Sequence, residues 1–104
     1  MIAVTTDKIE GKKIVEVFGL VMGNTVRARH LGRDLMAGLR NLVGGEVIEY
    51  SRLLAESREQ SLTRLVQRAE EKGANAVVGL RFVTSVIAGG AAEILAYGTA
   101  VKTE

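Results

Sequence analysis

A stretch that is apolar on both of its sides constrains this chain more than any other feature. Residues 13–22 read KIVEVFGLVM, and within them VFGLVM has Gly19 as its only gap in side-chain bulk. Such a β-branched, apolar run predicts a strand, which Gly23-Asn24 would end. A strand with two apolar sides belongs in a sheet whose two faces are both covered.

The remaining elements surround this strand in a regular order. Further strands are expected over residues 2–6, 75–86 and 92–101, the last two joined by a Gly-Gly turn. Leucines at helical spacing predict a helix over residues 30–43, and a longer helix over 46–72 is closed by Gly73. The order β-β-α-α-β-β predicts one α+β domain over residues 1–104. It would have an antiparallel sheet of about four strands and two helices packed on one face.

Composition narrows the classes of function. The chain has no cysteine, which excludes disulfides and thiolate metal sites. Its 14 basic and 12 acidic residues are mixed along the helical segments, so we expect no nucleic-acid partner. No run approaches the ~20 apolar residues of a membrane span, and no signal peptide is visible. We therefore expect a cytoplasmic protein without a membrane partner.

Residues 30–45 read HLGRDLMAGLRNLVGG and include the only histidine of the chain. Glu46 follows the glycines where a phosphate-binding loop needs Lys and Ser or Thr, so that motif is absent. His30 and Asp34 lie one helical turn apart and could orient a general base or supply two metal ligands. Arg33 and Arg40 share the same face and could cradle an anion or bridge to carboxylates of a neighbouring subunit.

Arg58 falls among apolar residues when the second helix is projected at 100° per residue. A guanidinium at such a position either extends to water at an edge or forms a buried clamp or anion site between subunits. We expect Arg58 to be at least half buried and bonded to a carboxylate or to carbonyls. Arg64, on the polar face, should be an ordinary surface side chain.

The sequence does not predict an enzyme. The candidate nucleophiles are Ser51, Ser57 and Ser61, but no base stands beside them in the sequence.

The face of the sheet without helices needs another cover, which predicts a homo-oligomer packed through the sheet. Ala96, Gly98 and Ala100 alternate along the last strand and would let another backbone approach closely.

Several stretches in order, RDLMAGLRNLVGG, SRE, GANAVVGLRF and GTAVKT, resemble the YbjQ-like family over nearly the whole chain. The resemblance implies a fold similar to that of dodecin subunits and assembly as pentamers, sometimes stacked as decamers. It offers no catalytic residues, and it leaves the cofactor unassigned. Its heavy-metal-binding label implies oxygen donors such as Asp34 and Glu59, or His30 side chains from several subunits.

Two hypotheses follow. The first is a non-enzymatic homo-oligomeric ring, most simply a pentamer, that presents a binding surface. The alternative is a protein that binds a metal or small anion, because symmetry multiplies one weak donor around an axis. Its candidate residues are Arg33, Arg40 and Arg58 for an anion, and His30, Asp34 and Glu59 for a metal.

Overall fold

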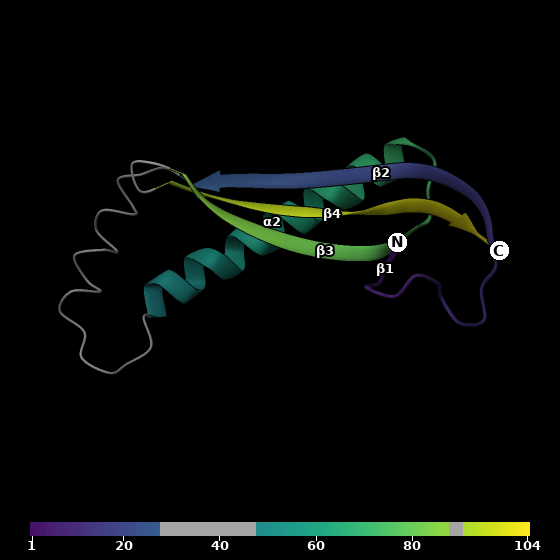
Figure 1. Ribbon diagram of the computed structural model, residues 1–104, viewed down its shortest axis with the longest axis horizontal. Coiled ribbons are helices and arrows are strands. Elements are labelled where there is room, and N and C mark those ends of the chain that lie inside the picture. The colour runs from purple at the N-terminus through teal and green to yellow at the C-terminus, as the bar shows by residue number, and fades with distance from the viewer. Residues whose placement is uncertain (28–47, 88–90) are drawn as a thin grey trace.

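The computed structural model describes residues 1–27, 48–87 and 91–104. Within them, one helix packs on one face of a four-stranded sheet (Figure 1). The elements are β1 (Ile2–Ala3), β2 (Ile14–Arg27), α2 (Ile48–Glu71), β3 (Ala76–Ile87) and β4 (Ala91–Thr103). The predicted α+β class is confirmed. The predicted helix over residues 30–43 lies outside the described residues, as do residues 88–90 of the Gly-Gly turn.

The strands lie in the order β1-β3-β4-β2. Antiparallel pairing joins β2 to β4 and β3 to β4, and it brings Ile87 opposite Ala91 at the predicted hairpin. β1, however, runs parallel to β3, with Ile2 opposite Ala76. The sheet is therefore mixed, and the prediction of a wholly antiparallel sheet is wrong at this edge. The parallel pairing arises because the segment after β1 crosses one end of the sheet to reach β2 on the far side.

β2 continues through Gly23 and Asn24 to Arg27, although the sequence predicts its end there. Gly23 marks a helix crossing and not a turn. A Cβ atom at Gly23 would lie 2.9 Å from the Cα of Leu65 and closer still to the Leu65 nitrogen and the Ser61 carbonyl oxygen. Only glycine lets α2 come this close to the strand.

The main core lies between α2 and the sheet. Every fourth residue of α2 is buried, namely Ser57, Ser61, Leu65 and Ala69. Such a row is inclined to the helix axis, which agrees with the oblique crossing of α2 over the sheet in Figure 1. Leu65 and Ala69 pack in one cluster with Val21, Val77, Ala96 and Ala100. Gly73, with φ of 91°, follows the helix as predicted.

The small residues of β4 belong to this core. Ala96 and Ala100 are fully buried in the cluster beneath α2. A Cβ atom at Gly98 would lie 2.7 Å from Cγ1 of Val77. The expectation that these residues admit another chain is therefore wrong, because the chain's own helix and strands already fill the space. Along the described residues, no helix is long and apolar enough to cross a bilayer.

Candidate functional site

The sheet face opposite α2 carries large apolar side chains that are exposed. They are Leu20 (62%), Met22 (43%), Val26 (53%) and Val83 (42%), and we call these four residues the open face. The pairing puts them on one side of the sheet: Leu20, Met22 and Val26 stand opposite Thr99, Tyr97 and Glu93 of β4, and Val83 stands opposite Leu95. α2 cannot cover them, because it packs on the other side.

The N-terminal segment covers only one end of this face. Val4, Ile9 and Ile14 pack against a second cluster, formed by Ala76, Val78 and Val101. Figure 1 shows the segment between β1 and β2 confined to the end of the sheet that holds both termini. The open face lies beyond the reach of this cover.

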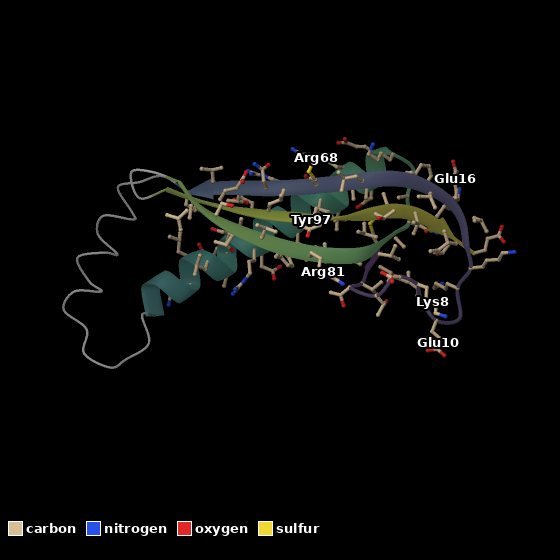
Figure 2. The ribbon with its side chains drawn as sticks, in the orientation of Figure 1. Lys8, Glu10, Glu16, Arg68, Arg81 and Tyr97 are labelled. Atoms are coloured by element: carbon tan, nitrogen blue, oxygen red, sulfur yellow. The ribbon has the colours of Figure 1, made fainter. Side chains whose placement is uncertain are left out.

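Three polar side chains near the open face, those of Asn24, Glu93 and Arg81, form hydrogen bonds within the chain. Asn24 donates through Nδ2 to Oε2 of Glu93 at 3.1 Å. Arg81 donates through Nη1 to the carbonyl oxygens of Thr5 and Leu80, both at 2.8 Å, and so ties the N-terminal segment to β3. Figure 2 shows Tyr97 and Arg81 on the neighbouring strands β4 and β3. These bonds leave the apolar side chains as the part of the surface that gains most from a partner.

A second exposed apolar patch lies on the α2 side of β3. Phe82 is 42% exposed and Val86 is 84% exposed. They stand opposite Ala96 and Ala92, so they share the face on which α2 packs. α2 lies mainly over β2 and β4 and leaves this part of β3 uncovered. We call Phe82 and Val86 the β3 patch.

Buried hydroxyl groups fasten α2 to the sheet. Ser61 Oγ lies within hydrogen-bond distance of the Ile94 carbonyl oxygen (2.8 Å), the Ser57 carbonyl oxygen (2.9 Å) and Thr25 Oγ1 (3.0 Å). Ser57 donates to the Leu53 carbonyl oxygen at 2.8 Å and accepts a hydrogen bond from Nε of Arg27 at 2.9 Å. Both serines thus serve in packing. The sequence signal for this network is a pair of serines four residues apart on an otherwise apolar helix face.

Arg58 does not take the predicted position. It is exposed on α2, so the expectation that the chain's own sheet buries it is wrong. The buried row of the helix is Ser57, Ser61, Leu65 and Ala69. Arg58 is one residue, about 100°, around the helix from Ser57, so its side chain stays at the surface. A contact of Arg58 with a neighbouring copy stays a prediction. Arg64, expected to be unengaged, donates to the Asn24 carbonyl oxygen at 2.6 Å.

Of the other predicted site residues, only Glu59 belongs to the described part of the chain. His30, Arg33, Asp34 and Arg40 lie outside the described residues, whereas Glu59 is exposed on α2. Across residues 1–27, 48–87 and 91–104, no group of three or more His, Cys, Asp or Glu side chains converges as a metal site needs. The described residues therefore do not by themselves fit a resident metal.

Comparisons with known proteins identify the family of this chain. The YbjQ family model, described as "Putative heavy-metal-binding", matches residues 1–104. A UPF0145 protein of Pyrococcus horikoshii is 59% identical, over 100% of this chain and 89% of that protein. A UPF0145 protein of Methanosarcina acetivorans is 57% identical, over 98% of this chain and 96% of that protein.

A solved structure supports the fold independently. The crystal structure of a DUF74-family protein of unknown function from Pediococcus pentosaceus superposes with a TM-score of 0.64. It covers 100% of this chain and 98% of that one at 15% sequence identity, so the likeness concerns the fold alone. The full-length match to the family model and the relatives above half identity show that this chain belongs to the YbjQ family.

Proposed function

We propose that the chain is the subunit of a non-catalytic homo-oligomeric ring that is assembled through its sheet and presents a binding surface. The observation that carries this proposal is the open face, where Leu20, Met22 and Val26 of β2 and Val83 of β3 are exposed on one side of the sheet. Exposed apolar surface of this kind marks interaction sites on proteins that stay in solution.

The free energy available at the open face favours a lasting contact. Fully burying a Val, Leu or Met side chain stabilises by about 1.5–3 kcal/mol relative to leaving it in water. The four side chains are partly exposed, so a partner would gain a fraction of that amount from each. A second copy is the occupant we propose, because every copy carries the same unfilled surface at the same concentration.

The positions of the two exposed patches favour a ring over a twofold dimer. The open face and the β3 patch of Phe82 and Val86 lie on opposite sides of the sheet. A contact between two different patches is head-to-tail, and such contacts close into rings when the rotation between subunits permits. The resemblance to pentamer-forming proteins gives five as the expected number of subunits.

Light scattering coupled to size-exclusion chromatography tests the assembly. Five copies of the 11.1 kDa chain would weigh about 55 kDa, and a single species near 11 kDa at micromolar concentration would contradict the proposal. The double variant Leu20→Lys/Val26→Lys should shift the mass toward the monomer. Its control is Glu10→Ala/Glu104→Ala, which changes the net charge equally at exposed positions and should keep the wild-type mass. Circular dichroism verifies that each variant is folded.

The family description favours a second candidate function, metal binding. We propose that the donors would be His30, Asp34 and Glu59, with copies of the chain contributing together around the axis of the assembly. Zinc, copper and nickel are titrated by calorimetry into the wild type and into His30→Ala. Binding no tighter than millimolar, or equal binding by the variant, would contradict a role for His30.

The anion version of this second candidate uses Arg33, Arg40 and Arg58. Here inorganic phosphate is the probe, and Arg40→Ala is the variant. Loss of phosphate binding in Arg40→Ala, with zinc binding unchanged, would support an anion site. Equal phosphate binding by wild type and variant would contradict it.

A further inference from the structure

One long edge of the sheet is formed by β2, which lies last in the strand order β1-β3-β4-β2. It pairs with β4 on one side, and its other side meets no strand among the described residues. A 14-residue strand with such an edge is a template for pairing with another polypeptide. The same strand contains three apolar residues of the open face. An unprotected edge would therefore favour edge-to-edge pairing between copies of the chain.

Two arginines of α2 reach this strand. Arg64 donates through Nη1 to the carbonyl oxygen of Asn24 at 2.6 Å, and Arg68 donates through Nη1 to the carbonyl oxygen of Met22 at 2.8 Å. Both arginine residues are exposed, so their charged groups lie at the surface. Figure 2 shows Arg68 beside β2, on the side away from β4.

The spacing of the two elements makes this pairing regular. Arg64 and Arg68 are one helical turn apart, a rise of about 6 Å. Met22 and Asn24 are two residues apart in a strand, about 6.8 Å, and their carbonyls point to the same side. One turn of α2 thus matches one repeat of the strand edge, and each arginine meets one carbonyl.

The first part of the opposite edge, along β3 as far as Leu80, is covered in a different way. The N-terminal segment runs beside β3, where Val4 donates its N–H to the Val77 carbonyl oxygen at 2.9 Å and accepts from the Leu80 N–H at 3.0 Å. On β3, backbone N–H and carbonyl groups of the N-terminal segment bond to backbone groups of the strand. On β2, the carbonyl oxygens of Met22 and Asn24 accept hydrogen bonds from arginine side chains, which also carry positive charge.

We propose that Arg64 and Arg68 close the outer edge of β2 to strand addition by a second copy of this chain. An incoming strand would have to displace two guanidinium groups from the acceptors that it needs, and it would meet their charge. Charged side chains at an exposed edge are a common protection against edge-to-edge pairing. The inference does not depend on the proposed ring; it states only which part of the sheet association avoids.

The test compares Arg64→Ala/Arg68→Ala with the wild type under conditions where circular dichroism shows folded protein. The double variant should form species heavier than the wild-type assembly, with light scattering and thioflavin T fluorescence rising at least several-fold faster. Lys12→Ala/Lys13→Ala removes the same charge from exposed positions away from α2 and should behave as the wild type. Equal rates for the two double variants would overturn the proposal.

Three further variants separate edge protection from general stability and from folding failure. Val66→Ala removes half-buried packing of α2 and leaves both arginines in place, so it should not accelerate association. If it accelerates association as much as the arginine variant, the proposal is wrong. Should the double variant fail to fold, the single variants Arg64→Ala and Arg68→Ala each free one carbonyl. Each single variant should then show an intermediate rate, and wild-type rates in both would overturn the proposal.

Discussion

The two faces of the sheet are covered by different parts of the chain and to different extents. On one face, the buried row of α2 crosses the middle of the sheet and packs against Val21 and Ala96. On the other face, the N-terminal segment covers only the end near Ala76 and Val101. The first face has a cover from the chain itself, and the second leaves large side chains at the surface.

Side-chain size differs between the place where α2 crosses the sheet and the open face. Beneath α2, the strands contribute Gly23, where the helix backbone approaches, and Ala96 and Ala100, which are fully buried in the core. Where the chain provides no cover, they contribute leucine, methionine and valine. Small residues therefore indicate where this fold closes on itself, and large exposed ones indicate where it offers a surface to a partner.

Gly23→Val should give the largest effect, because it forces the helix off the covered face. Its Cβ would meet backbone atoms of Leu65 and Ser61, which cannot move aside by changing rotamer. Overpacking of this kind costs about 3 kcal/mol or more of unfolding free energy, measured by urea denaturation. Gly11→Ala is the control, since a Cβ there meets nothing within 4 Å and only its φ of 81° opposes the change. The control should cost about 1 kcal/mol, and equal losses would contradict the close approach.

Leu65→Ala tests the packing of the covered face with no clash involved. Leu65 is fully buried at the crossing, and removing such a side chain costs about 2–5 kcal/mol. Val101→Ala, in the cluster under the N-terminal segment, removes less and should cost about 2 kcal/mol. Urea denaturation of the two variants shows which of the two clusters contributes more to the free energy of unfolding. A larger loss of unfolding free energy in Val101→Ala than in Leu65→Ala would contradict the expected order.

Ile9→Ala weakens the partial cover on the other face. Ile9 is half-buried against Ala76, Val78 and Val101, so we expect a loss of about 1 kcal/mol. The N-terminal segment should also open more often. Amide hydrogen exchange at Val4 and Leu80 reports this opening, because their N–H groups join the segment to β3. Unchanged exchange at both amides would show that Ile9 does not hold the cover in place.

Arg58→Ala should give the smallest effect on the chain's own stability. Arg58 is exposed on α2, and exposed substitutions usually change stability by less than about 0.5 kcal/mol. The melting temperature gives this value, and light scattering on the same sample gives the mass of the assembly. A lower mass with an unchanged chain stability would assign Arg58 to a contact between copies.

Local patterns predicted the main elements well. The helix expected over residues 46–72 is α2, Ile48–Glu71, because its glycine stop and its spacing of apolar residues are both local signals. The direction of β1 could not be predicted, because a two-residue strand carries no register of its own. Gly23-Asn24 was misleading for a related reason. A glycine beneath a crossing helix and a glycine in a turn look the same in the sequence.

The site was predictable only in outline. A strand that is apolar on both sides indicated that a helix could cover only one of them, and the open face carries the side chains left exposed. The alternation of Ala96, Gly98 and Ala100 showed that they share a face but not which face it is. For Arg58, helical projection placed the residue among apolar neighbours but did not show that the row facing the sheet is the adjacent one of Ser57, Ser61, Leu65 and Ala69. The hydroxyl network around Ser61 requires knowing that Thr25 and Ile94 lie beside it.

The pairing of β2 has a consequence for how the chain is made. Its ladder partner, β4, is synthesised after α2 and β3, since Ile14 pairs with Thr103 and Arg27 with Ala92. At roughly 5–20 residues per second, β2 leaves the ribosome on the order of seconds before β4. Throughout that interval the apolar segment VFGLVM lacks its ladder partner, and exposed apolar segments of this kind are what chaperones bind. We therefore expect the yield of folded chain in cells to fall when elongation is slowed between β2 and β4, and to recover when chaperone supply is raised.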